Sequence, residues 1–105
     1  MHQHEAWLLS LAVELPLLVV MLYRYEVKRV VWAGVVATSL THPVAWWAAG
    51  LLAPAEYAQG VVVIEIVVWA TESVLLRFML PIQWATAAAC ACLVNTASMT
   101  VGWFV

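Results

Sequence analysis

The chain has 105 residues, of which 67% are hydrophobic and 10% are charged, and its mean hydropathy is +0.99. A water-soluble domain of this length needs a largely polar surface, so the composition excludes one and predicts an all-α integral membrane protein. The net charge of −2 supplies no basic surface for nucleic acid, and no nucleic-acid partner is expected.

Four apolar segments take up nearly the whole chain. Each is close to the length of about 20 residues that a helix needs to cross roughly 30 Å of hydrocarbon. The predicted spans are residues 6–23, 30–52, 60–79 and 83–105. Because the connections are short, consecutive helices should be antiparallel. We therefore expect one integral membrane domain, residues 1–105, folded as an antiparallel four-transmembrane-helix bundle.

The basic residues predict the orientation of these helices. Arg24, Lys28 and Arg29 lie in the first connection, and Arg77 borders the third span. The N-terminal segment, the second connection and the C-terminal segment carry no Lys or Arg. Since basic connections stay in the cytoplasm, both termini are predicted on the outer side of the membrane.

Each span carries a strongly polar residue near its middle: Glu14, His42, Glu72 and Asn95 in chain order. An acid at the centre of a membrane helix costs about 2.5–3.5 kcal/mol on insertion scales. With a rise of about 1.5 Å per residue, all four fall near the membrane midplane. A chain that accepts such a cost in every span is expected to use these residues.

Two further polar residues extend this layer toward the outer side. Glu65 precedes Glu72 by seven residues, and Ser98 follows Asn95 by three, so each pair shares a helix face. We interpret Glu65 and Ser98 as an access route to the midplane residues.

Two prolines adjoin the polar layer and predict helix kinks. Pro16 follows Glu14 closely, and Pro43 directly follows His42. Each ring removes a backbone hydrogen bond within a helix and frees a carbonyl oxygen. At membrane depth such carbonyls need a neighbour, a water or a bound ion, and broken helices of this kind line binding sites in transporters.

Two interpretations of the midplane residues remain open. In the first, they form a hydrogen-bonded clamp that joins the helices. In the second, they bind a cation or a proton, as part of a transporter or channel. Glu14 and Glu72 would then bind the charge, His42 would act as a ligand or relay, and Asn95 would orient them. Glu14, His42 and Glu72 could also hold a divalent metal ion, the possible cofactor.

The alternative function is an accessory or structural subunit of a larger membrane complex. Such a subunit would present its polar residues to a partner helix, or use His42 as an axial ligand for a pigment or haem. The chain contains no GxSxG, HExxH, CxxC or glycine-rich phosphate loop, which argues against an enzyme. The expected partners are the lipid bilayer and either further copies of the chain or other membrane subunits.

The succession Glu14–Leu15–Pro16, Thr41–His42–Pro43, the paired Glu65 and Glu72, and Asn95 with Ser98 resembles small bacterial inner-membrane proteins. These are four-helix proteins of about this length, and the resemblance spans nearly the whole chain. It implies a four-helix fold and a location in the bacterial inner membrane. In that membrane, the outer side predicted for both termini from the basic residues is the periplasmic side. It implies no activity for any residue.

Overall fold

The computed structural model describes residues 2–104, apart from the side chain of Trp103, and this part of the chain is all-α, as predicted. Met1 and Val105, at the ends of the predicted domain, lie outside the described residues. The helices are α1 (Gln3–Met21), α2 (Val27–Gly50), the short 3-10 helix η1 (Pro54–Glu56), α3 (Tyr57–Met79) and α4 (Trp84–Trp103). Of these, α1 and α4 are long and apolar enough to cross a membrane.

Three of the four helices begin before the apolar segments that predicted them, and α1 and α2 end two residues short of those segments. α1 and α2 each begin three residues before the predicted spans, and α3 begins at Tyr57 rather than at residue 60. Lys28 and Arg29, expected in a connection, therefore lie in the first turn of α2. The reason is that Lys, Arg, Gln and Glu are good helix formers, so a change in hydropathy does not end a helix.

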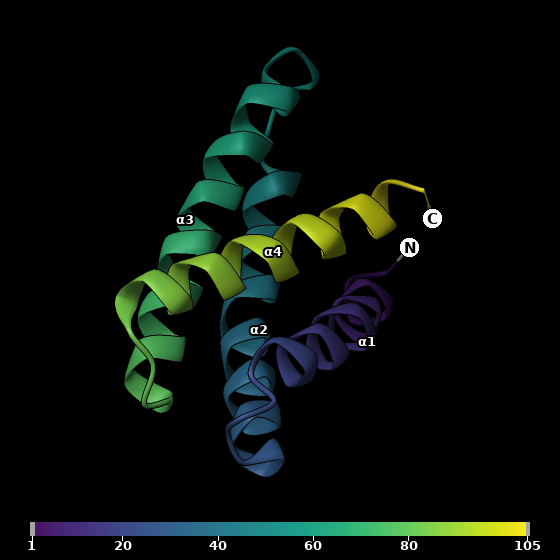
Figure 1. Ribbon diagram of the computed structural model, residues 1–105. Helices are drawn as coiled ribbons and strands as arrows, with labels where there is room; N and C mark the ends of the chain where they lie inside the picture. Colours follow the sequence, from purple (N-terminus) through teal and green to yellow (C-terminus); the bar gives the residue numbers. More distant parts are fainter. Residues whose placement is uncertain (1, 105) are drawn as a thin grey trace.

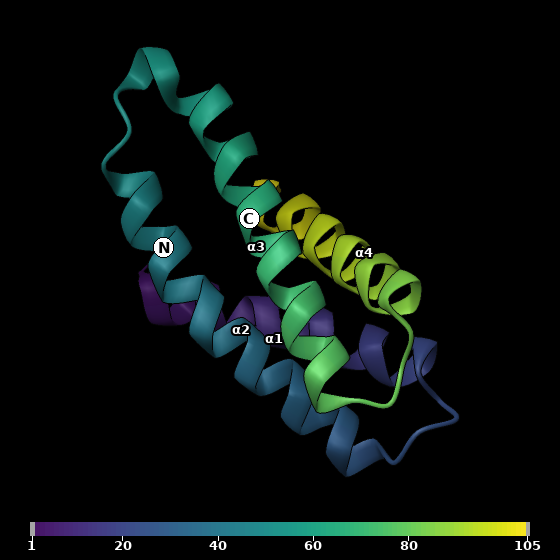
Figure 2. The same cartoon turned by 90° about the vertical axis from the view of Figure 1, so that its left-hand side faces the viewer.

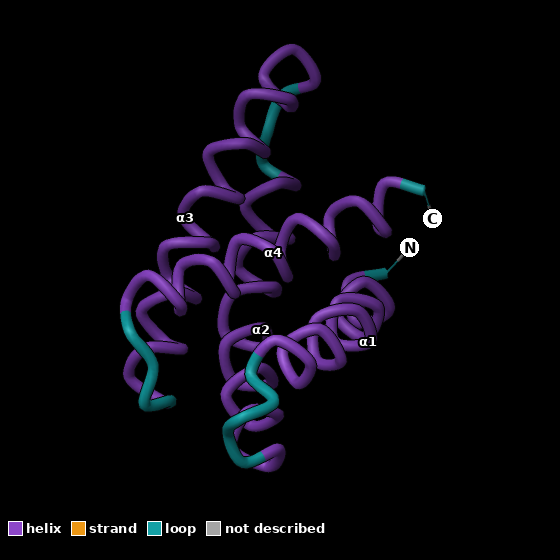
Figure 3. Tube along the Cα trace, in the orientation of Figure 1, coloured by secondary structure: helices purple, strands orange, loops and turns teal. Residues whose placement is uncertain are grey.

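Consecutive helices run in opposite directions and are joined by short connections (Figures 1 and 3). α2 and α3 form a hairpin, and α1 and α4 are inclined to it (Figures 1 and 2). The contacts between helices join α1 to α2, α2 to α3, α3 to α4, and α4 back to α1. The four helices thus form a closed ring around a central space.

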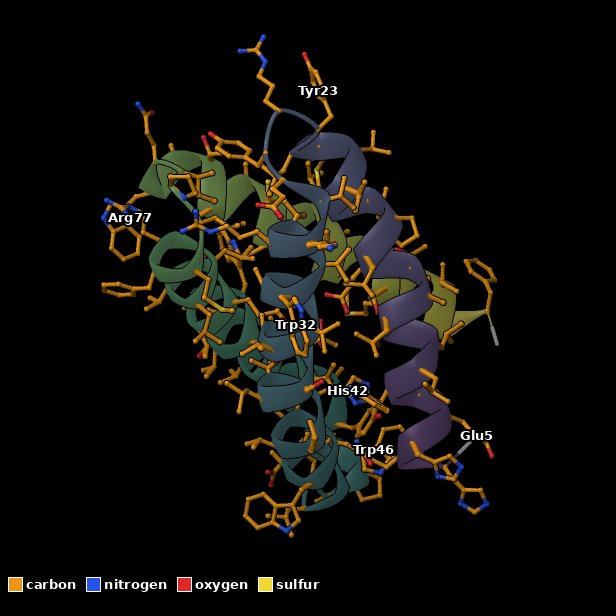
Figure 4. All side chains as sticks on the ribbon, turned by 90° about the horizontal axis from the view of Figure 1, so that it is seen from below. Glu5, Tyr23, Trp32, His42, Trp46 and Arg77 are labelled. Atoms are coloured by element: carbon orange, nitrogen blue, oxygen red, sulfur yellow. The ribbon has the colours of Figure 1, made fainter. Side chains whose placement is uncertain are left out.

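The apolar core fills one end of this ring. Its large members are Leu18, Leu22, Val30, Leu76, Leu80, Ile82 and Val94, packed with small residues of α2 and α4. α1 and α2 approach closely here, at Gly34. A Cβ atom on this residue would lie only 2.7 Å from Cδ2 of Leu15. This is the end of the α1–α2 and α3–α4 connections, toward which Tyr23 and Arg77 lie in Figure 4. At the other end the helices enclose a cavity.

Candidate functional site

A cavity of about 450 Å³ lies between the four helices, beyond the apolar core. All four helices contribute to its wall, which extends from Glu14 and Glu72 toward Ala6 on α1 and Gly102 on α4. His42 and Trp46 lie on the side of α2 that faces α1 (Figure 4). The core therefore closes one end of the ring, and the cavity occupies the part between the helices' other ends.

The six residues singled out in the sequence all line this cavity: Glu14, His42, Glu65, Glu72, Asn95 and Ser98. Glu65 and Glu72 face the same space, as their seven-residue spacing predicts. Pro16 and Pro43 lie inside the uninterrupted helices α1 and α2, and both rings are exposed. The prolines therefore adjoin the site residues in sequence without lining the cavity.

Glu14 is placed by a buried stripe on α1. The buried residues of this helix are Ala6, Ser10, Glu14 and Leu18, spaced four apart on one helix face. Glu14 is only 2% exposed, and its Oε1 atom has no hydrogen-bond partner among the described residues. The side chain of Thr38 on α2 lies beside the carboxyl group. One oxygen of a buried carboxyl is thus left without a partner at the cavity wall.

Glu72, which is 3% exposed, has partners for both oxygens. The Thr41 hydroxyl of α2 donates to Oε1 at 2.9 Å, and the Asn95 amide of α4 donates to Oε2 at 2.7 Å. The same Asn95 nitrogen donates to the carbonyl oxygen of Ala91, also at 2.7 Å. Glu72 therefore joins α2, α3 and α4 through a satisfied set of hydrogen bonds.

The Thr41 hydroxyl lets this set accommodate either protonation state of Glu72. Its oxygen lies 2.9 Å from the Ala37 carbonyl oxygen as well as 2.9 Å from Glu72 Oε1. The hydroxyl has one hydrogen and can donate to only one of them at a time. When Glu72 is ionised, Thr41 donates to it. When Glu72 is protonated, its own O–H donates to Thr41, which then donates to Ala37.

His42 forms a second polar part of the wall. Its ring stacks on Trp46, one turn further along α2, with the centroids 6.3 Å apart. The buried Nδ1 atom has no hydrogen-bond partner among the described residues. An imidazole with an uncommitted nitrogen can accept or donate a proton at the cavity surface.

The access-route residues differ in how firmly they are held. The Ser98 hydroxyl donates to the Ser10 hydroxyl at 3.0 Å and thereby joins α4 to α1. Glu65 is partly buried and has no hydrogen bond among the described residues. Ser98 therefore helps to close the ring, whereas the carboxyl of Glu65 is not fixed by a polar contact.

Five polar or aromatic lining residues were not among the predicted site residues: Ser10, Thr38, Thr41, Trp46 and Tyr57. Thr38 and Trp46 lie four residues either side of His42, and Thr41 directly precedes it. Residues four apart lie on the same helix face, so the position of His42 could have identified Thr38 and Trp46 as lining residues. A threonine hydroxyl within a helix commonly donates to a carbonyl oxygen of its own helix, as Thr41 does, so a threonine is a weak signal of a functional site.

The predicted metal centre of Glu14, His42 and Glu72 is not assembled in the structure. Among residues 2–104, no three His, Cys, Asp or Glu side chains lie close enough to hold one metal ion. The two oxygens of Glu72 instead accept hydrogen bonds from Thr41 and Asn95.

The charge of the cavity wall is one-sided. Glu14, Glu65 and Glu72 contribute carboxyl groups, and no described Lys or Arg lines the cavity. Carboxylates in a poorly solvated space need protons or a positively charged partner to offset their desolvation. Carboxyl groups arranged in this way can release protons and bind a cation in their place.

In comparisons with known proteins, no family model, no curated protein and no solved structure matches this chain. The roles of the site residues must therefore be argued from their own geometry.

Proposed function

We propose that this chain is an integral inner-membrane protein in which all four helices cross the bilayer, with both termini on the periplasmic side. The helices contain 19, 24, 23 and 20 residues, close to the roughly 20 residues that span hydrocarbon. Large apolar side chains are exposed on every helix, for example Val20, Val44, Val63 and Leu93. Hydrocarbon is the solvent that such a surface suits.

The charged residues of α2 and α3 are compatible with this proposal, because they either line the cavity or lie near the helix ends. Glu65 and Glu72 line the central cavity. Lys28, Arg29 and Arg77 lie near helix ends, where long basic side chains can reach the membrane surface. Their position at the end of the α1–α2 and α3–α4 connections supports a cytoplasmic location for that end.

The function that the cavity supports best is the binding of a cation at Glu14, as a step in transport across the membrane. The observation that carries this proposal is the unpartnered Oε1 atom of a carboxyl group that is 2% exposed and lines a cavity without Lys or Arg among the described residues. A residue that only joined helices would have both oxygens bonded, as Glu72 has. Glu14 lacks this property of a clamp.

The remaining site residues have different roles in this proposal. Glu72, Thr41 and Asn95 hold α2, α3 and α4 in position and add negative charge when Glu72 is ionised. His42 exchanges protons with the cavity through its uncommitted nitrogen. Proton exchange at His42 and the carboxyls would couple binding of a cation to release of protons.

The experiment that tests the proposal is calorimetric titration of the protein, reconstituted in lipid nanodiscs, with a panel of cations: Na⁺, Mg²⁺, Mn²⁺, ammonium and tetramethylammonium. We expect at least one to bind and to release protons, and Glu14→Gln to abolish that binding. Glu56→Gln, which alters an exposed acid of η1, is the matched control and should bind as the wild type does. Absence of binding, or binding unchanged by Glu14→Gln, would favour the accessory subunit.

A further inference from the structure

A second, outward-facing groove lies between α3 and α4. It has a volume of about 190 Å³, and exposed side chains form its outer part: Val62, Ile66, Trp69, Cys92, Thr96 and Met99. These surfaces face lipid if the helices span the membrane as proposed. The groove is mostly apolar and therefore suits a hydrocarbon chain.

The groove and the central cavity share part of their walls. Val61, Glu65, Asn95 and Met99 line both spaces. Asn95 is held in place by Glu72 and Ala91, whereas Glu65 has no hydrogen bond among the described residues. The partition between the lipid-facing groove and the acidic cavity therefore includes one fixed amide and one carboxyl that no polar contact restrains.

Trp69 fixes one end of the groove. Its indole N–H donates to the Ala88 carbonyl oxygen across 2.7 Å and ties α3 to α4 there. A ligand held between these helices must therefore lie on the Glu65 side of this contact, next to the cavity.

We infer that the ligand is an amphiphilic organic cation, whose ammonium group lies in the central cavity near Glu14 and whose apolar tail lies in the α3–α4 groove. This inference rests on the proposed cation binding and names the class of ligand. The unpartnered Glu14 oxygen and the two further carboxyls attract the positive head. The apolar groove on the other side of Glu65 accommodates the tail once the unrestrained Glu65 side chain moves aside.

The shape and lining of the cavity favour an organic cation over a metal ion. A volume of 450 Å³ is far larger than a bare ion needs, and no three metal-ligating side chains converge among residues 2–104. Trp46 and Tyr57 supply aromatic rings to the wall. Aromatic faces attract ammonium groups, which share their positive charge with attached carbon atoms.

The tail adds selectivity through shape. A tail that moves from lipid into an apolar groove gains little hydrophobic free energy, because both surroundings are apolar. Blocking the groove should therefore act by steric conflict, preventing the head from reaching its place while the tail is attached. A cation without a tail should be insensitive to the block.

The test compares dodecyltrimethylammonium with tetramethylammonium in calorimetric titrations of the nanodisc-embedded protein, with empty nanodiscs subtracted. Cys92→Trp fills the groove, and Leu93→Trp places the same side chain at the next exposed position of α4, outside it. We expect Cys92→Trp to weaken binding of the dodecyl compound at least about tenfold, a change of about 1.4 kcal/mol, and to leave tetramethylammonium unchanged. Leu93→Trp should alter neither affinity.

Equal effects of Cys92→Trp on both cations, or no effect on either, would overturn the inference and leave cation binding at Glu14 intact. Failure of both cations to bind the wild type would also overturn the inference, and cation binding at Glu14 would then be decided by the other cations of the panel. If Cys92→Trp does not fold, Thr96→Trp fills the same groove from the next turn and gives the same comparison.

Discussion

The Asn95 amide of α4 donates a hydrogen bond to Oε2 of Glu72 on α3 across 2.7 Å. If the helices span the bilayer as proposed, lipid supplies no hydrophobic force that draws them together, and polar contacts of this kind carry much of their association. The contact also fixes the rotation of both helices. It thereby determines which side chains of α3 and α4 line the cavity opposite Glu14.

The coupling between these two residues is measurable. A double-mutant cycle with Glu72→Ala and Asn95→Ala should give a coupling free energy of about 0.6–1.7 kcal/mol, the range found for polar contacts between membrane helices. Unfolding in mixed detergent micelles gives the free energy of unfolding of the wild type, the two single variants and the double variant. The control cycle combines Glu72→Ala with Thr100→Ala. Thr100 is suitable because its exposed hydroxyl donates only to the Thr96 carbonyl oxygen of its own helix. Equal couplings in both cycles would contradict the clamp.

The two buried acids should respond differently to replacement by methionine. Glu72→Met removes a group that accepts two hydrogen bonds and should lower the free energy of unfolding by about 1–3 kcal/mol. Glu14→Met removes a carboxyl with an unpartnered oxygen and should leave stability unchanged or raise it. Detergent unfolding of both variants checks this difference. A larger loss in Glu14→Met than in Glu72→Met would show that Glu14 is part of the clamp.

The closed end of the ring depends on small residues of α4. Ala87 is fully buried against the apolar core, whereas Ala89 is exposed on the same helix. Ala87→Leu should destabilise the protein by about 1–3 kcal/mol through overpacking, and Ala89→Leu should have little effect. The two variants add the same volume and can be compared by unfolding. Similar losses in both would mean that α4 packs through a different face.

The charge asymmetry predicts the membrane topology. Alkaline phosphatase, which is active only in the periplasm, should be active when fused at the C-terminus or after Ala53. It should be inactive when fused after Tyr25, between the basic residues Arg24 and Lys28. The matched fusions to a fluorescent protein should give the opposite pattern. Activity after Tyr25 would reverse the proposed orientation.

Much of the helical organisation can be predicted because the signals are local. Long apolar segments mark the four helices, and a spacing of seven residues places Glu65 and Glu72 on one face. The strongly polar residues within the apolar segments also predict the cavity wall, which all four of them line: Glu14, His42, Glu72 and Asn95. These inferences need no knowledge of how one helix packs against another.

The unequal roles of Glu14 and Glu72 could not be predicted, because they depend on the rotation and inclination of neighbouring helices. Trp7, in the second turn of α1, donates to Ser39, halfway along α2. α1 is therefore inclined to α2, and Glu14 lies beside Thr38, one turn before His42. A depth calculated from the rise per residue treats all helices as parallel and misses this offset.

Carbodiimide labelling tests the central claim, that Glu14 binds a cation, most directly. Dicyclohexylcarbodiimide modifies protonated carboxyl groups in apolar surroundings, and peptide mass spectrometry identifies the modified residue. The label should appear at Glu14 ahead of Glu72, and the tightest-binding cation of the panel should protect Glu14 in proportion to its occupancy. Labelling of Glu14 that no cation slows would contradict the claim, as would labelling of Glu72 with Glu14 untouched.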